Sequence, residues 1–110
     1  MTKYLFLYRG QFPKEPPSPE HLQLMLGRWQ SWRQKFKDQV VDMGDGLKGE
    51  GKLLRDGRVS DGPLPEAKEI IGGYSIIRAE SVEQALEVAR ECPIALMPGA
   101  EIEIRELMGF

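Results

Sequence analysis

The sequence predicts an α+β fold, with one antiparallel sheet and two helices packed on the same face of it. Hydrophobic periodicity changes along the chain in the order strand, helix, strand, strand, helix, strand. Both helical stretches also follow a serine, which is a favoured N-cap residue. This order is that of the split βαβ, or ferredoxin-like, arrangement. Short, right-handed connections then place both helices on one face of the sheet.

The first strand is expected over residues 3–9, whose five central residues are all aromatic or aliphatic. A proline-rich loop over residues 10–19 follows it. At the end of this loop, Ser18 can cap a helix and Pro19 suits the first helical position. The first helix is therefore expected to begin at Pro19.

This helix is expected to end near Lys37, because its apolar residues recur with helical spacing. These residues are Leu22, Met25, Leu26, Trp29, Trp32 and Phe36. Each indole can bury a large apolar area, so the two tryptophans are expected to form the floor of the core. A stacking platform for a planar ligand is the alternative role for this pair.

The middle of the chain is expected to form a short strand and then a hairpin. The strand covers residues 40–43 and is expected to break at the Gly-Asp-Gly of residues 44–46. The hairpin pairs residues 52–55 with residues 58–60 across Asp56-Gly57, a strong signal for a two-residue turn.

The last third of the chain repeats the strand–helix–strand order. Residues 74–79 are strongly β-prone, and Ser81 with Gln84 forms a capping box that begins the second helix. Pro93 ends this helix. The last strand is expected over residues 101–107, where apolar and charged residues alternate.

Length and composition exclude several classes of protein. A chain of 110 residues is expected to form a single domain, residues 1–110. A net charge of −2 argues against a nucleic-acid-binding surface, and the apolar runs are too short to span a membrane. One cysteine and one histidine leave no disulfide and no zinc cluster, which is typical of a reducing cytoplasm. No metal or cofactor is expected, and the N-terminus resembles a strand rather than a signal peptide.

The sheet face without helices is expected to find a partner, because a domain this small rarely exposes a broad apolar face. A second copy of the chain is the expected partner, which gives a two-fold homodimer with two sheets facing each other.

The stretch over residues 60–74 has a conformationally restricted start and a flexible glycine pair near its end. Asp61-Gly62 is a turn signal, and the prolines that follow restrict the backbone. Gly72-Gly73 allows a bulge or the close approach of another backbone or a ligand. The carboxylates and the lysine between these two turns could therefore be held in position as a binding site requires. An ordinary connection between strands, with its charged side chains in solvent, would have the same sequence features.

The motif Asp-Gly-Pro-Leu at 61–64, followed by Glu-Ala-Lys-Glu at 66–69 and Gly-Gly-Tyr at 72–74, resembles the DGPF-type proteins of the YCII-related family. The resemblance extends over nearly the whole chain. Leu64 stands where the family usually has phenylalanine, and Ala67 replaces a common threonine, which removes one hydroxyl from the motif.

This resemblance implies a dimeric α/β barrel of ferredoxin-like protomers, with the pocket between the two sheets. Similar proteins are small lyases, isomerases and monooxygenases that often need no cofactor. The wider family is associated with a His–Asp pair that does acid–base work, and some DGPF-type members are linked to sigma-factor regulation. Fold alone does not choose among these functions.

Three residues are candidates for catalysis. Asp61 is the strongest candidate, since partial burial beside the dimer cleft would suit it to general acid–base work. It could equally serve only to fix the turn. His21, in the first turn of the first helix, and Tyr74 are expected to assist, and exposure to solvent is the alternative for His21.

Five further residues are expected to bind substrate: Glu66, Lys68, Glu69, Tyr8 and Arg105. Lys68 could neutralise a substrate carboxylate, although surface ion pairs are the commoner use of such residues. Tyr8 and Arg105 lie in strands, where packing or a place at the rim is as plausible. Cys92 is expected to be a small buried residue and not a nucleophile.

Two classes of function follow. The leading interpretation is a small cofactor-independent enzyme of the lyase or isomerase type, which moves a proton on a small organic molecule in the dimer cleft. The alternative is a non-catalytic ligand-binding or regulatory domain. An enzyme should hold two titrating groups within reach of one ligand, whereas a binding module should show an apolar pocket with satisfied carboxylates.

Overall fold

A computed structural model describes residues 1–10, 17–61 and 70–110 of the chain. The elements, in order, are β1 (Thr2–Gly10), α1 (Pro19–Lys35), β2 (Val40–Gly46), β3 (Lys52–Arg55), β4 (Arg58–Asp61), β5 (Ile70–Ala79), α2 (Val82–Arg90), η1 (Pro93–Leu96) and β6 (Glu101–Glu106). Most of the expected first loop and most of the expected Asp-Gly-Pro-Leu motif lie outside the described residues.

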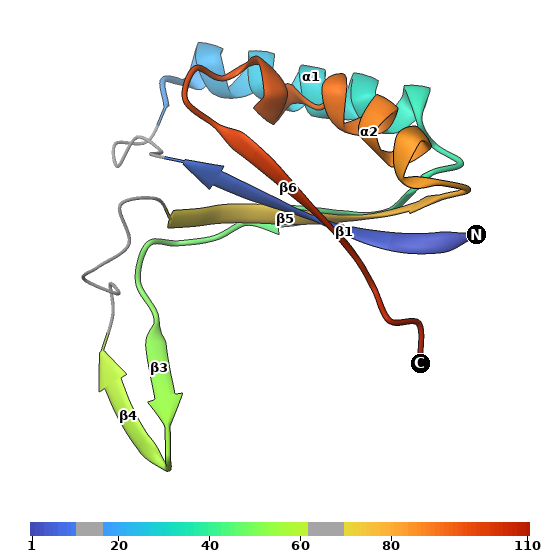
Figure 1. Ribbon diagram of the computed structural model, residues 1–110. Coiled ribbons are helices and arrows are strands. Elements are labelled where there is room, and N and C mark those ends of the chain that lie inside the picture. The colour runs from blue at the N-terminus through green and yellow to red at the C-terminus, as the bar shows by residue number, and fades with distance from the viewer. Residues whose placement is uncertain (11–16, 62–69) are drawn as a thin grey trace.

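The main sheet has four strands in the order β2-β5-β1-β6, and all three pairings are antiparallel. Both helices lie on one side of it (Figure 1). The strand first in the chain and the strand after the hairpin occupy the centre, and the other two strands occupy the edges. This is the ferredoxin-like order, so the predicted fold class is confirmed.

Strands β3 and β4 form a separate two-stranded sheet. Asp56 and Gly57 between them have φ angles of 51° and 75°. Two successive left-handed residues are what a tight two-residue hairpin turn requires, so the predicted turn is confirmed. The hairpin projects from the side of the main sheet that faces away from the helices (Figure 1).

The edge strand β2 differs from the expectation at its glycines. The Gly-Asp-Gly of residues 44–46 was expected to end the strand, but β2 continues through Gly46. Its pairing with β5 shifts register between Asp42 and Asp45, so the glycines form a bulge. Gly72 bulges likewise from β5 opposite Tyr8, as the Gly-Gly pair predicted.

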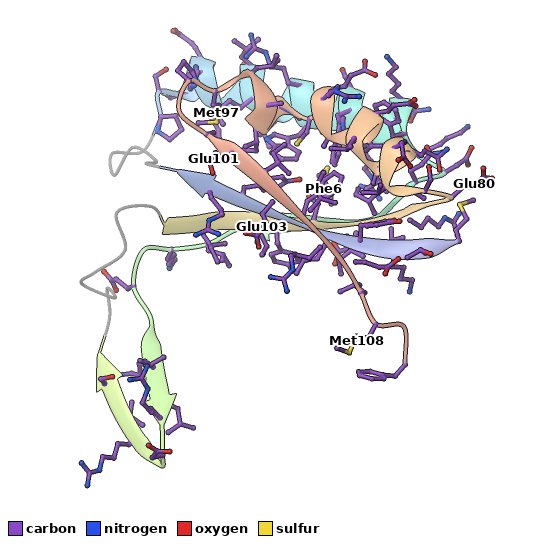
Figure 2. All side chains as sticks on the ribbon, in the orientation of Figure 1. Phe6, Glu80, Met97, Glu101, Glu103 and Met108 are labelled. Carbon is purple, nitrogen blue, oxygen red and sulfur yellow. The ribbon has the colours of Figure 1, made fainter. Side chains whose placement is uncertain are left out.

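The core lies between the sheet and the helices. Alternate residues of β1 and β5 point into it, and small residues of α2 pack on them: Tyr4, Phe6, Tyr8, Ser75, Ile77, Ala79, Ala85, Val88 and Ala89. Figure 2 shows Phe6 in this layer. Trp32 on α1 is only 3% exposed and Trp29 packs against the same cluster. The expected tryptophan floor is confirmed.

The apolar stripe expected along α1 is correct only in its C-terminal half. Leu22 and Leu26 are 46% and 52% exposed, whereas Trp29, Trp32 and Phe36 contact the core. Among the described elements, α1 comes closest to η1 and stays farther from the sheet, because indole rings fill the space between them. Leucines one or two turns before the indoles are too short to bridge that space.

Both predicted helix starts are confirmed. The Ser18 hydroxyl accepts a hydrogen bond from the His21 backbone amide, and the Ser81 hydroxyl accepts one from the Gln84 amide, each at 3.2 Å. The Gln84 side chain accepts in turn from the Glu80 amide at 2.7 Å. Each cap satisfies backbone donors that the first turn of a helix leaves free. No helix within the described ranges is long and apolar enough to cross a membrane.

Candidate functional site

The sheet face away from the helices combines apolar and charged side chains. Along β1, Leu5, Leu7 and Arg9 point to this face, because they alternate with the buried tyrosines and phenylalanine. Tyr74 lies opposite Leu7 on one side, and Glu103 lies opposite Leu7 on the other. All five side chains are partly buried in a single chain, so the face is neither fully exposed nor covered.

Three charged residues form a cluster on this face. The Arg9 guanidinium donates to Glu103 at 2.8 Å through Nη1, and Arg105 lies 3.5 Å from the second oxygen of the same carboxylate. Arg9 Nε is buried and has no hydrogen-bond partner among the described residues. The side chain of Arg105 is 70% exposed and retains free donor positions. Glu103 therefore contacts two guanidinium groups, and the exposed Arg105 is the group of this cluster with donors left for an anion.

A groove of about 1050 Å³ lies beside this cluster, between the sheet face and the C-terminal segment. Its lining combines apolar side chains with two basic residues and one acidic residue, including Lys3, Leu5, Leu7, Arg105, Glu106, Leu107 and Phe110. The Leu107 amide donates to the Lys3 carbonyl at 2.9 Å and so fixes where the segment leaves the sheet. Figure 2 shows Met108 beyond this point, on the side away from the helices. An apolar floor with cations at its edge suits a small organic anion.

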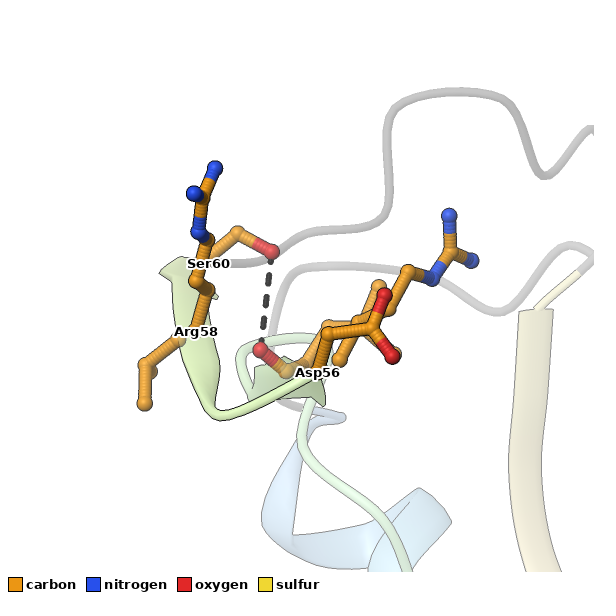
Figure 3. A pocket seen from close by; sticks show the side chains of 6 residues that line it. Asp56, Arg58 and Ser60 are labelled. Atoms are coloured by element: carbon orange, nitrogen blue, oxygen red, sulfur yellow. Dashed lines mark hydrogen bonds between the residues drawn. The ribbon is translucent and has the colours of Figure 1, made fainter.

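A second hollow, of about 550 Å³, lies on the β3–β4 hairpin and is drawn in Figure 3. Its lining includes Arg55, Arg58, Asp56 and Ser60, and the Ser60 hydroxyl donates weakly to the Leu53 carbonyl at 3.5 Å. All of its walls come from one two-stranded ribbon. A small molecule needs walls on several sides to be desolvated, so the sheet face is the better candidate site.

The structure places Tyr74 and Arg105 on the open sheet face. Tyr8 lies on the opposite face, buried beneath the helices. The pleat of β1 sends Tyr8 and its neighbours Leu7 and Arg9 to opposite sides of the sheet. Tyr8 and Arg105 therefore do not line one site within a chain.

Tyr8 belongs instead to a buried chain of hydrogen bonds. The Cys92 thiol donates to the Tyr8 hydroxyl at 3.5 Å, Tyr8 donates to Ser75 at 2.5 Å, and Ser75 donates to the Met43 carbonyl at 2.7 Å. This chain joins the end of α2 to three strands. Burial raises the pKa of the Tyr8 phenol above its ordinary range and raises the pKa of the Cys92 thiol. Cys92 is fully buried, as expected, and is no candidate nucleophile.

These two pKa shifts predict a loss of stability in alkali. The unfolded phenol ionises near pH 10 and the unfolded thiol near pH 9, whereas burial keeps each group protonated to higher pH in the folded protein. The free energy of unfolding should be level below about pH 9 and should fall above it, by up to about 1.4 kcal/mol per pH unit and per group.

Urea unfolding between pH 8 and 11.5 measures this fall. The Tyr8→Phe variant is expected to be less stable at pH 8 by about 1–2 kcal/mol but to lose stability less steeply above pH 10. An equally steep fall in the variant and the wild type would contradict the assignment to Tyr8.

Of the remaining predicted site residues, the structure describes His21 and Asp61, which lie on elements on opposite sides of the main sheet. His21 lies in the first turn of α1 and is exposed, on the helix side of the sheet. Asp61 is the last residue of β4, whose hairpin projects from the other side (Figure 1). Glu66, Lys68 and Glu69 lie outside the described residues.

Arg9 and Glu103 are site residues that sequence reasoning missed. Strand alternation could have placed Arg9 on the face of Leu5 and Leu7, and Glu103 on the face of Arg105. The sequence did not show that β1 and β6 are neighbours, and only this pairing brings Arg9 to Glu103.

No group of three histidine, cysteine, aspartate or glutamate side chains is arranged to hold a metal ion within the described part of the chain. In β2, the Asp42 carboxylate accepts a hydrogen bond from the Gly44 backbone amide at 2.8 Å. The Asp45 carboxylate accepts one from the Gly46 backbone amide at 2.7 Å. Both carboxylates therefore hold the bulge of β2 in shape.

Comparison with family models agrees with the resemblance seen in the sequence. The family model of the YCII-related domain matches residues 16–110. A search of curated proteins gave no match. Among solved structures, the chain is similar to 5-chloro-2-hydroxyhydroquinone dehydrochlorinase (TftG) from Burkholderia phenoliruptrix AC1100, in complex with 2,5-dihydroxybenzoquinone. The sequence identity is 17%, the TM-score is 0.46, and the match covers 92% of this chain and 90% of the other.

Proposed function

Because this chain belongs to the YCII-related family, we propose that it binds a small organic anion on its open sheet face and moves a proton on it without a cofactor. A second copy of the chain covers the face, so that the site lies between two sheets. Asp61 is the acid–base group, Tyr74 assists it, and Arg105 with Arg9 binds the anion.

The charged cluster is the observation that carries this proposal. Glu103 holds Arg9 in place at 2.8 Å, while Arg105 keeps donors free beside the groove. A planar guanidinium matches the geometry of a carboxylate or an enolate. The apolar groove floor would exclude water and strengthen that interaction once a second sheet covers it.

The homodimer is supported by the character of the open face. Leu5, Leu7, Tyr74 and Ile76 form an apolar row across β1 and β5, and the helices lie on the other side. A two-fold axis would bring the same row of a second copy against it.

The proposed chemistry is a proton transfer next to a carbonyl group. The Asp61 carboxylate takes a proton from the carbon, the electron pair of the C–H bond moves into the carbonyl to give an enolate, and the arginines stabilise its charge. The phenol of Tyr74 donates a hydrogen bond to the enolate oxygen. The protonated Asp61 then returns the proton to the carbon skeleton. Tyr74 takes the assisting role here because His21 lies on α1, across the sheet.

The motif residues Glu66, Lys68 and Glu69 follow Asp61 closely in the sequence, so we assign them to the substrate-binding rim. Lys68 would attract the anion, whereas the two glutamates would repel a ligand that carries a second negative charge. Any substitution at these three positions should therefore change substrate affinity more than the rate of proton transfer.

Anion binding is tested with benzoate and its neutral isostere benzamide. Chemical shifts of backbone amides on β1 and β6 are followed as each probe is titrated. The wild type should bind benzoate at least about tenfold more tightly than benzamide, and Arg105→Gln should remove that preference. Arg28→Gln, an exposed arginine on α1, is the matched control and should keep it. Equal affinity for both probes in the wild type would contradict an anion site.

Proton transfer is tested with pyruvate in deuterated water, where exchange of the methyl protons is followed by proton spectra. The wild type should speed this exchange above the buffer rate, and Asp61→Asn should slow it by about a hundredfold or more. Asp56→Asn, in the turn of the same hairpin, is the control. Binding of pyruvate without faster exchange would contradict the catalytic proposal.

The second candidate is a non-catalytic ligand-binding domain, including a regulatory role of the sigma-factor type. The engagement of Glu103 by two arginines favours it, because a binding domain is expected to show satisfied carboxylates beside an apolar surface. The pyruvate experiment separates the candidates. The enzyme exchanges the protons, whereas the binding domain only binds.

A further inference from the structure

The β3–β4 hairpin projects away from the other described helices and strands. Its two strands, Lys52–Arg55 and Arg58–Asp61, pair closely with each other, and neither packs closely on another described element. A two-stranded hairpin alone in water is marginally stable at best. Strands this short need an apolar surface to pack against if they are to remain formed.

The hairpin carries an apolar ridge that could make such a contact. Leu54 and Val59 are cross-strand partners, so their side chains share one face of the ribbon. They are 70% and 62% exposed in the single chain. A directly opposed pair of exposed aliphatic residues on a projecting hairpin marks a contact surface more clearly than scattered single residues do.

The chain is more extended than a compact monomer of its length. The radius of gyration is 15.3 Å, against about 13 Å for a compact domain of this length. The accessible surface is 8635 Å², whereas a monomeric protein of 12.5 kDa exposes about 6,200 Å². The excess is several times the roughly 800 Å² that each partner buries in a standard interface.

The direction of the hairpin identifies the partner. It projects from the side of the main sheet that carries the open face, away from the helices (Figure 1). A second copy seated on that face would lie alongside the hairpin. We infer that the β3–β4 hairpin is an arm that packs its Leu54–Val59 ridge onto the second copy of this chain.

This inference rests on the dimer of the proposed function and adds a second contact to it. Two-fold symmetry gives each dimer two arms, so one substitution removes two contacts. Asp61 is the last strand residue of the arm, which projects on the side of the open face. A contact between the ridge and the partner would therefore fix the backbone at Asp61 when the dimer forms.

Sedimentation velocity across a concentration series tests the arm. Val59→Asp places a charge on the ridge, where docking would have to desolvate it, and should raise the dimer Kd about tenfold or more. Ser60→Asp is the matched control, because it adds the same charge at the next residue, on the opposite face of the ribbon. The dimer Kd of the control should stay within about twofold of the wild type. Equal Kd values for all three proteins would overturn the arm contact.

Hydrogen exchange of the wild type provides a measurement that does not depend on a variant. Amides that pair β3 with β4 should be protected at concentrations where the dimer forms and should exchange rapidly after dilution to monomer. Equal protection of these amides at both concentrations would also overturn the inference.

A third variant separates failure of the arm from failure of the facing-sheet dimer. Ile76→Asp charges the centre of the open face and should dissociate the dimer. If Ile76→Asp dissociates the dimer and Val59→Asp leaves its Kd unchanged, the arm inference fails and the proposed dimer stands. If the wild type is a monomer at all concentrations, both fail.

Discussion

Replacing Gly44 with alanine is expected to lower the free energy of unfolding by about 3–5 kcal/mol, or to prevent folding. Gly44 has a φ angle of +74°, which L-residues rarely adopt. A Cβ added there would lie 1.8 Å from the carbonyl oxygen of Tyr74, well inside contact distance. The bulge of β2 could not relax without losing its pairing with β5.

Gly51→Ala is the matched control, because a Cβ at Gly51 meets nothing within 4 Å. Its free energy of unfolding should stay within about 0.5 kcal/mol of the wild type. Urea unfolding followed by circular dichroism measures both variants. A Gly44→Ala protein as stable as the Gly51→Ala protein would show that β2 is not bulged here. The experiment also concerns the candidate site, because the carbonyl that the added Cβ would strike belongs to Tyr74, whose side chain lies on the open sheet face.

Replacing Trp32 with alanine should also cost about 3–5 kcal/mol of the free energy of unfolding. The indole is 3% exposed and its Nε1 donates to the Val88 carbonyl at 3.0 Å. Val88 lies in the last turn of α2, where helical carbonyls have no partner within the helix. The substitution therefore leaves a cavity and also leaves a buried carbonyl without its donor.

Two conservative variants separate these effects. Trp32→Phe keeps most of the volume but removes the donor, and it should cost about 1–3 kcal/mol. Trp29→Phe changes a partly buried indole, whose ring lies edge-on to Trp32 at 5.5 Å, and it should cost less. Thermal unfolding followed by tryptophan fluorescence ranks the variants. If Trp29→Phe lowers the stability more than Trp32→Ala does, Trp32 is not the main helix residue of the core.

Both large effects arise where distant segments meet. Gly44 lets β2 approach β5, and Trp32 joins the first helix to the end of the second. The open sheet face depends on both contacts, because the core behind it holds β1 and β5 in position. Loss of either contact should therefore weaken benzoate binding through loss of folded protein, whereas Arg105→Gln should weaken it with the fold intact.

The sequence by itself determined the main strands and both α-helices of this protein and their order. Strand and helix periods, the serine caps at Ser18 and Ser81, and the Asp56-Gly57 turn depend on interactions between residues a few positions apart. Such local signals are complete within a short stretch of chain. They identified the ferredoxin-like order, and the motif that begins at Asp61 identified the family resemblance.

Only the tertiary structure decided which side chains share a surface. The pairing of β1 with β6 brings Arg9 to Glu103, 94 positions away in the sequence, and the pleat of β1 separates Tyr8 from both. The exposed leucines of α1 likewise depend on how far the indoles hold the helix from the sheet. Contacts between distant segments depend on the packing of the whole chain, and no local period encodes them.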